Sequence, residues 1–143
     1  MRRSIRFLPI ILAALAACSS SEDDLSLEPE AANVSADTGQ TFELKAGQTA
    51  RVGNAGLVIG FRGVASDSRC PVDVTCVWQG DAELRMQASM ARRAWTPLTL
   101  HTGVEPRSAQ FQNYTITVVS LTPEPREGQR IPSDRYTVTL RVE

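Results

Sequence analysis

The chain has 143 residues, of which 42% are hydrophobic and 22% are charged, and its formal net charge is −1. This length allows about one ordinary domain. The balanced charge removes the usual electrostatic argument for nucleic-acid binding, and the apolar content is too high for a wholly disordered chain. No apolar run reaches the roughly 18 residues that a membrane-spanning helix needs. The composition therefore indicates one globular domain without a nucleic-acid partner.

Residues 1–17 have the layout of a secretory signal peptide. Three arginines in the first six residues precede an almost wholly apolar stretch, which is too short to cross a bilayer comfortably. The stretch ends in Leu15-Ala16-Ala17-Cys18, which resembles the lipobox of bacterial lipoproteins. The resemblance implies cleavage before Cys18 and lipidation of its sulfur, so that acyl chains anchor the mature protein to a lipid bilayer. A plain signal peptide with an incidental cysteine is the alternative.

Residues 18–40 are expected to form a disordered, lipid-anchored linker. After Cys18 the stretch holds six acidic residues and no Lys or Arg, and Ser, Ala and Pro fill most of the rest. Such a composition cannot bury enough surface to offset its ordering entropy. Ser19 stands where enterobacterial lipoproteins retained at the inner membrane carry Asp. The resemblance therefore favours the outer membrane of the cell envelope, on its periplasmic face or at the cell surface.

The three cysteines leave one unpaired in an exported protein, and an odd cysteine needs an explanation. If Cys18 carries lipid, Cys70 and Cys76 remain as a disulfide pair in a compartment that favours disulfides. Zinc or copper held by these two thiolates and His101 is the alternative. The spacing of the two cysteines is not the C-x2-C spacing that metal sites prefer, so we expect no metal and no cofactor.

From residue 41 onward, apolar and polar residues alternate as they do in half-buried β-strands. The alternation shifts by one residue at Val119, and Gly60 and Gly63 indicate β-bulges. Six or seven short strands in residues 41–143 predict a single all-β domain, an antiparallel β-sandwich of immunoglobulin-like or Greek-key type, with a small barrel as the alternative. The expected strands are residues 41–46, 50–52, 57–64, 82–90, 95–100, 114–118 and 136–142.

The most distinctive stretch is DSRCPVDVTCVWQGDA at residues 67–82. It resembles a motif of small, largely uncharacterised bacterial lipoproteins, in which S-R-C-P is followed by four residues and then by C-x-W. The resemblance covers most of residues 41–143 and carries no established activity. A structural interpretation accounts for the motif: a disulfide closes the loop, Pro71 stiffens it, Trp78 packs over the bridge at the start of a strand, and Gly80 permits a bulge.

The same stretch is the candidate binding loop of the domain. Calcium held by the three aspartates in the loop is an alternative, but their spacing lacks the ligand density of an EF-hand. The side chains that we single out as candidates for binding are Asp67, Arg69, Asp73, Trp78 and Asp81.

Catalysis has little support in the sequence. His101 is the only histidine, and its position predicts an exposed strand end. No G-x-S-x-G, H-E-x-x-H or phosphate-cradling glycine loop occurs. We therefore expect a protein that is not an enzyme.

The expected function is that of a non-catalytic envelope lipoprotein whose domain binds an envelope protein or glycan, or has a structural role. Inhibition of envelope or host hydrolases, such as lysozymes or proteases, is the alternative, with the 67–81 loop as the wedge. Trp95 with Arg92 and Arg93, and residues 122–134, are a further candidate recognition edge.

Overall fold

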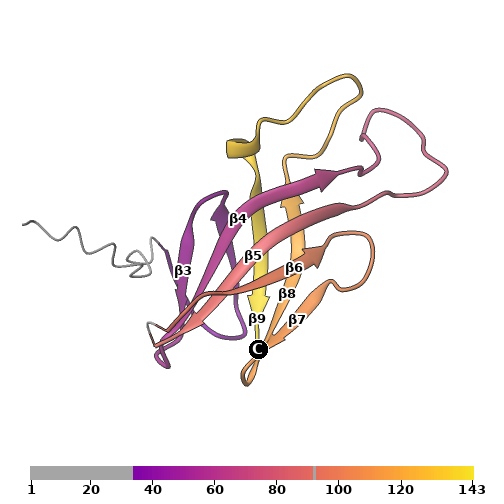
Figure 1. The fold of residues 1–143 in the computed structure, drawn as a ribbon. Helices are drawn as coiled ribbons and strands as arrows, with labels where there is room; N and C mark the ends of the chain where they lie inside the picture. The colour runs from indigo at the N-terminus through magenta and orange to yellow at the C-terminus, as the bar shows by residue number, and fades with distance from the viewer. Residues whose placement is uncertain (1–33, 92) are drawn as a thin grey trace, which may run out of the picture.

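The structure is a computed structural model that describes residues 34–91 and 93–143. The signal peptide, the lipidation site Cys18, most of the expected linker and Arg92 lie outside these residues. The described chain forms two facing β-sheets that do not close into a barrel (Figure 1). The antiparallel β-sandwich predicted from the alternation is thus confirmed.

The first sheet has five strands in the order β1-β3-β4-β5-β6. Four of them form an antiparallel meander, and β1 adds to its edge in parallel with β3. The strands are β1 (Val34–Ala36), β3 (Thr49–Val52), β4 (Leu57–Asp67), β5 (Ala82–Met90) and β6 (Thr96–His101).

The second sheet has four strands in the order β2-β9-β8-β7, and all of its pairs are antiparallel. The last strand pairs with β2, so that both ends of residues 41–143 are tied into one sheet. A short 3-10 turn, η1 (Ser133–Arg135), precedes the last strand. The strands are β2 (Thr41–Lys45), β7 (Ser108–Phe111), β8 (Tyr114–Thr122) and β9 (Thr137–Val142).

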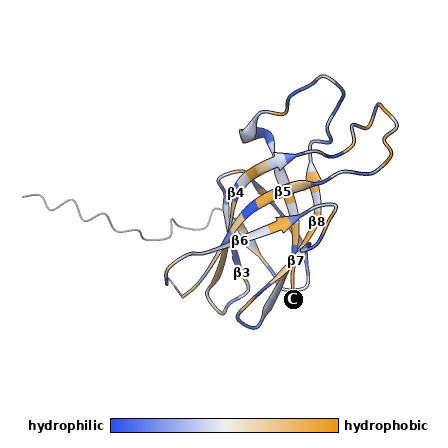
Figure 2. Cartoon of the chain, turned by 45° about the vertical axis from the view of Figure 1, so that its right-hand side comes forward, coloured by the Kyte–Doolittle hydropathy of each residue, from blue (hydrophilic) through white to orange (hydrophobic). Residues whose placement is uncertain are grey.

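The core lies between the two sheets. In β5 the even-numbered residues from 82 to 88 are buried and residues 83, 85 and 87 are more exposed, and in β9 Val138, Leu140 and Val142 are buried while the alternating residues are more exposed. Figure 2 shows the hydrophobic colour spread along the strands. The strand alternation is therefore caused by burial of one face of each sheet. The largest fully buried side chains are Phe61, Leu44, Leu57, Ile59, Leu84, Met86, Leu100, Ile116, Leu140, Val52, Val118 and Val138.

Three register shifts interrupt the ladders. Two lie in β4, between Phe61 and Gly63 and between Val64 and Ser66, and the third lies in β8 between Val118 and Ser120. The shift predicted at Val119 and the bulge predicted near Gly63 are confirmed, whereas Gly60 pairs regularly with Gln87.

The domain begins earlier than predicted. Val34–Ala36, which we placed in the disordered linker, form strand β1 and pair with Ala50–Val52. Strand β7 was also missed, because four residues are too few to show an alternation.

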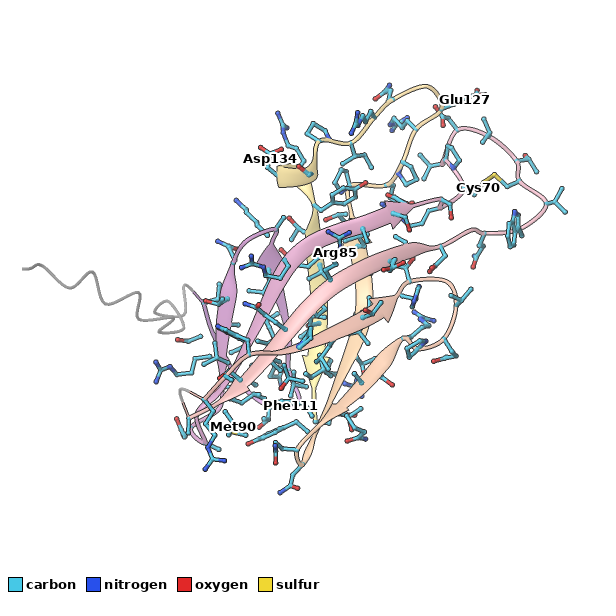
Figure 3. All side chains as sticks on the ribbon, viewed as in Figure 1. Cys70, Arg85, Met90, Phe111, Glu127 and Asp134 are labelled. Carbon is cyan, nitrogen blue, oxygen red and sulfur yellow. A yellow bond between two sulfur atoms is a disulfide. The ribbon has the colours of Figure 1, made fainter. Side chains whose placement is uncertain are left out.

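Two long loops project from the same end of the sandwich (Figure 1). One joins β4 to β5 and is called the 68–81 loop; the other joins β8 to β9 and is called the 123–136 loop. Figure 3 labels Cys70 and Glu127 at this end, and Met90 and Phe111 at the opposite end. Within residues 34–91 and 93–143, no helix has the length and hydropathy that crossing a membrane requires.

Candidate functional site

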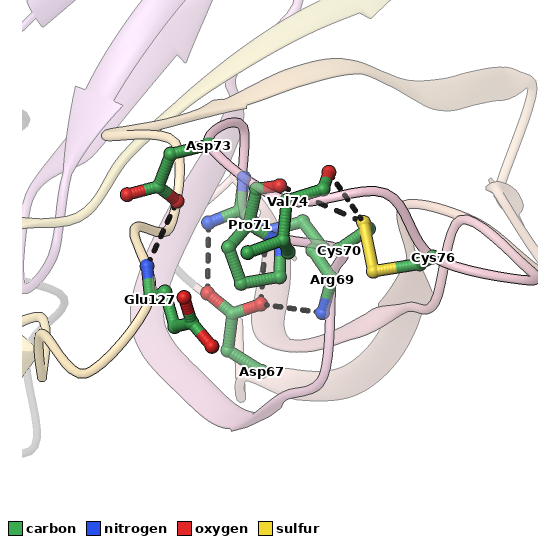
Figure 4. The surroundings of a disulfide bond; sticks show 8 residues. All are labelled: Asp67, Arg69, Cys70, Pro71, Asp73, Val74, Cys76 and Glu127. Atoms are coloured by element: carbon green, nitrogen blue, oxygen red, sulfur yellow. Dashed lines mark hydrogen bonds and ion pairs between the residues drawn. A yellow bond between two sulfur atoms is a disulfide. The ribbon is translucent and has the colours of Figure 1, made fainter.

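The candidate site is the end of the sandwich where the two long loops lie against each other. The backbone N–H of Val72 donates to the Pro125 carbonyl at 3.0 Å. Figure 4 shows the second bond, in which the N–H of Glu127 donates to Asp73 Oδ1 at 2.9 Å. In both bonds, a residue from the middle of the 68–81 loop is joined to a residue of the 123–136 loop. The two loops therefore support each other although more than fifty residues separate them in the sequence.

The disulfide predicted between Cys70 and Cys76 is present, with 5.9 Å between the two Cα atoms. Below it, the ladder of β4 and β5 continues into the loop. The N–H of Ser68 donates to the Asp81 carbonyl and that of Cys70 to the Gln79 carbonyl, both at 2.7 Å. Cys70 is thus tied to Cys76 through sulfur and to Gln79 through its N–H. Only two residues lie between these attachment points.

The partly buried side chain of Arg69 joins the bases of the two loops. Its guanidinium donates to both carboxylate oxygens of Asp67, from Nε at 2.9 Å and from Nη2 at 2.7 Å. It also donates to the carbonyls of Leu121 at 2.6 Å and Pro123 at 2.9 Å, where the 123–136 loop leaves β8. The Arg69 and Asp67 side chains are only 13% and 10% exposed. This bidentate arginine therefore fixes the base of both loops.

Tyr136 completes the cluster around Asp67. Its buried hydroxyl donates to Asp67 Oδ2 at 3.0 Å. Burial raises the pKa of the Asp67 carboxyl, but hydrogen bonds and charge from Arg69, with the Tyr136 hydroxyl, outweigh it and hold that pKa below its usual value. Burial and then the neighbouring Asp67 carboxylate raise the pKa of Tyr136. The pair is therefore a charged carboxylate and a neutral phenol at neutral pH.

Asp81 ties the 68–81 loop to the turn after β6. Its Oδ1 accepts the backbone N–H groups of Thr102 at 3.0 Å and Gly103 at 2.8 Å, and its Oδ2 lies 2.6 Å from His101 Nδ1. Burial raises the pKa of the Asp81 carboxyl, but the hydrogen bonds, led by that from Gly103, lower it by more. The pKa of Asp81 therefore lies below its usual value. Asp81 is thus the acceptor that holds this turn in place.

His101 ends β6 as predicted, but its side chain is only 19% exposed, so the expected exposed strand end is wrong. The ring turns to Asp81, which a pattern of alternation does not reveal.

Gly80 lies in the loop before β5 rather than in a bulge, so that prediction is wrong. Its φ is +69°, and a Cβ built on it would overlap the Ser68 carbonyl oxygen. Glycine is required here because the two arms of the loop approach closely at this residue.

Trp78 does not pack over the disulfide as predicted. Its side chain is 79% exposed, and β5 begins only at Ala82. Val77 is fully exposed and Val72 is 52% exposed in the same loop. Figure 2 shows hydrophobic colour in the outer part of this loop. We call Val72, Val77 and Trp78 the tip; its two valines were missed because a loop has no period that predicts which side chains face water.

The candidate binding residues therefore separate into two groups. Asp67, Arg69 and Asp81 are partly buried and bonded within the domain, and Asp73 accepts the Glu127 N–H, whereas Trp78 faces solvent. No group of three His, Cys, Asp or Glu side chains within residues 34–91 and 93–143 is placed to hold a metal ion. The three aspartates considered for calcium each have separate partners: Arg69 and Tyr136 for Asp67, the Glu127 N–H for Asp73, and the turn after β6 for Asp81. The zinc or copper alternative fails because the cysteines are bonded to each other.

No protein-family model, no curated protein and no solved structure matches this chain.

Proposed function

We propose that this protein is a lipid-anchored module of a bacterial cell envelope, not an enzyme, which binds another protein through the tip of its 68–81 loop. The single observation that carries the binding role is the exposure of three large apolar side chains, Val72, Val77 and Trp78, together in one loop. Exposed apolar side chains that are grouped indicate an interaction site more often than single ones do, and tryptophan dominates the energetics of many interfaces.

The construction of the loop supports this role. Val77 and Trp78 lie between two attachments to Cys70, one through the disulfide and one through the Gln79 carbonyl. Their backbone is therefore ordered before any partner arrives. Binding then avoids the cost of ordering a flexible loop, which is about 1–2 kcal/mol for each backbone residue.

The shape and charge of the tip favour a concave protein surface over a bilayer. The loop projects from the end of the sandwich (Figure 1), so its partner must supply the cavity. Residues 70–80 contain no Lys or Arg and one exposed acid, Asp73, whereas the 123–136 loop carries exposed residues of both signs. The tip segment therefore offers none of the basic side chains that an anionic membrane surface attracts.

The anchor rests on the lipobox resemblance at residues 15–18 and on the acidic stretch that follows it. A tether of this composition extends by charge repulsion and gives the domain reach from the membrane. The resemblance favours the outer membrane as the site of anchoring.

Photocrosslinking in cells tests the binding role. A crosslinking residue at position 78 of the full-length protein should form one discrete adduct, and the same residue at position 119 should not. Val119 is the matched control, because it is exposed but lies on β8. With the adduct partner purified, Trp78→Ala should weaken binding at least about tenfold, while Val119→Ala should leave it unchanged.

The bilayer is the competing outcome. The secreted Cys18→Ser protein, which carries no lipid, should not cosediment with vesicles of phosphatidylethanolamine and phosphatidylglycerol. Cosedimentation that is lost on Trp78→Ala would show that the tip binds a membrane rather than a protein, and it would overturn the proposal.

Inhibition of a hydrolase is a second candidate, favoured by the narrow, doubly attached form of the loop. A wedge of this kind suits the active-site cleft of a lysozyme or protease. Inhibition by the wild-type protein that is lost on Trp78→Ala and retained on Val119→Ala would support it. Inhibition unchanged by Trp78→Ala would exclude the loop as the wedge.

A further inference from the structure

A cavity of about 510 Å³ lies on the outer face of the first sheet, away from the 68–81 loop tip. Residues 83, 85 and 87 alternate with the buried residues of β5, so their side chains face outward. Figure 3 labels Arg85 where β4 and β5 run side by side. The polar and aromatic lining residues are Arg62, Glu83, Arg85, Gln87, Trp95 and Thr99.

The bulge in β4 brings two arginines to this cavity. Phe61 pairs with Met86 and Gly63 with Arg85, so Arg62 is the extra residue of the bulge and lies beside Arg85. Bulges commonly redirect a side chain next to a functional site. Both arginines are exposed, and neither has a hydrogen bond or an ion pair with another residue of the described chain. Like charges side by side are unfavourable in a sheet, and within residues 34–91 and 93–143 neither guanidinium forms an ion pair with a carboxylate.

Trp95 adds an apolar ring to the cavity and is half-buried. Gln87 occupies the space that Gly60 leaves open, since a Cβ on Gly60 would meet the Gln87 side chain at 2.9 Å. Its amide is thus held against the sheet with its donors and acceptor near the cavity. Glu83 is the only carboxylate among the lining residues, so two guanidiniums outnumber it.

We propose that this cavity binds an acidic sugar, that is, a saccharide unit whose ring carries a carboxylate or a phosphate group. The paired guanidiniums recognise the anionic group, because arginine binds carboxylate and phosphate through two parallel hydrogen bonds. The indole face of Trp95 packs against the apolar face of the ring. The Gln87 amide and the Glu83 carboxylate bond to ring hydroxyl groups. A few placed polar groups beside an aromatic wall are typical of small-molecule sites.

The two arginines together with Trp95 should make the cavity prefer an acidic sugar to a neutral sugar and to a simple anion. A neutral sugar leaves both guanidiniums unpaired, and inorganic phosphate leaves the tryptophan uncovered. The site is independent of the tip and of the protein partner proposed for it, so the two proposals fail separately.

NMR titration of the secreted Cys18→Ser protein tests the inference. The probes are glucuronate and glucose 6-phosphate, with glucose and inorganic phosphate as the part-ligands. We expect saturable shifts of the Trp95 indole N–H and of β5 amides with both acidic sugars at millimolar concentration or below. Each part-ligand should bind at least about tenfold more weakly, the loss expected for one charge-assisted hydrogen bond.

Three variants locate the site. Trp95→Ala, Arg85→Gln and Arg62→Gln should each weaken binding of both acidic sugars at least about tenfold. Arg51→Gln is the matched control, because Arg51 is an exposed arginine of the neighbouring strand β3 that does not line the cavity. All three variants lie on the surface, and their folding is checked from the dispersion of the same spectra.

Two results would overturn the inference. One is that neither glucuronate nor glucose 6-phosphate gives saturable shifts at concentrations up to 10 mM. A Kd of about 10 mM is roughly the weakest affinity that such a site would supply. The other is binding that all three cavity variants retain, or that Arg51→Gln weakens equally, because the guanidiniums would then act only as general surface charge.

Discussion

Arg69→Ala is the substitution that most directly tests the account of the two-loop end. In the native protein the guanidinium makes two hydrogen bonds to Asp67 and one each to the carbonyls of Leu121 and Pro123. The alanine variant leaves the Asp67 carboxylate, which is 10% exposed, with Tyr136 as its remaining side-chain donor. Removing one partner of a buried ion pair typically destabilises a protein by about 3–5 kcal/mol, because the other charge stays buried without compensation.

Thermal unfolding measures this loss directly. For a domain of this size, about 3–5 kcal/mol corresponds to a fall in Tm of roughly 10–25 °C. Arg141→Ala is the matched control. Arg141 also forms an ion pair, with Glu143 at 2.6 Å, but the two side chains are 48% and 57% exposed. An ion pair at the surface contributes little, so the control should change the free energy of unfolding by less than about 1 kcal/mol.

The destabilisation caused by Arg69→Ala should also depend on pH. The Asp67 pKa in the native protein is lower than in the unfolded chain, where it is about 3.9. Its contribution to stability is therefore present above pH 4 and is lost as the pH falls through the native pKa. In Arg69→Ala, burial dominates and raises the Asp67 pKa, so the buried group takes up a proton more readily. The two proteins should differ most at pH 7 and converge toward pH 3. A loss below about 1 kcal/mol at pH 7, or an equal loss at both pH values, would refute this reasoning.

Three further predictions concern the same end of the molecule. Gly80→Ala should destabilise the domain by more than about 3 kcal/mol in urea unfolding, because the added Cβ would overlap the Ser68 carbonyl. Gly128 has a similar φ of +67° but open space around it, so Gly128→Ala should cost only about 1 kcal/mol, and equal losses would contradict the argument from close approach. Replacing Cys70 and Cys76 by serine should lower the free energy of unfolding by about 2 kcal/mol, the chain-entropy value for a short loop. Reductant should destabilise the native protein by a similar amount and leave the variant unchanged; a native protein that reductant does not destabilise would contradict this role of the disulfide. Asp81→Ala should lower the free energy of unfolding by about 2–3 kcal/mol, because two backbone N–H groups and His101 lose their acceptor. Hydrogen exchange at the Thr102 and Gly103 amides should accelerate, and unchanged exchange would contradict this role of Asp81.

The sequence predicted the features that repeat and missed those that depend on a single contact. Residues 82–90 alternate over nine positions and form β5 with the same bounds. Val34–Ala36 and Ser108–Phe111 are too short to show a period, so both strands were missed. The disulfide followed from counting cysteines, and the counting holds wherever the two residues lie in the fold.

The side-chain directions in the 68–81 loop could not be predicted in the same way. Trp78 was expected over the bridge because large aromatic rings are usually buried, yet it faces solvent. Arg69 was expected to bind a partner because charged loop residues are usually exposed, yet its side chain is only 13% exposed and bonds to two carbonyls more than fifty residues away. The direction of Arg69 is set by the carbonyls of Leu121 and Pro123, and no local pattern encodes a contact at that separation. Trp78 has no strand alternation around it that would predict which way its ring faces.

The positions of these two residues divide stability from recognition within one loop. Arg69 precedes Cys70 and points inward to Asp67, and Trp78 follows Cys76 and points outward. Because the groups that hold the loop are satisfied within the domain, substitutions at the exposed tip remove few internal contacts and leave the scaffold intact. The tip can therefore vary to suit a partner while the buried cluster keeps its geometry. Changes at Arg69 would alter binding only by disturbing the loop, and changes at Trp78 would alter it directly.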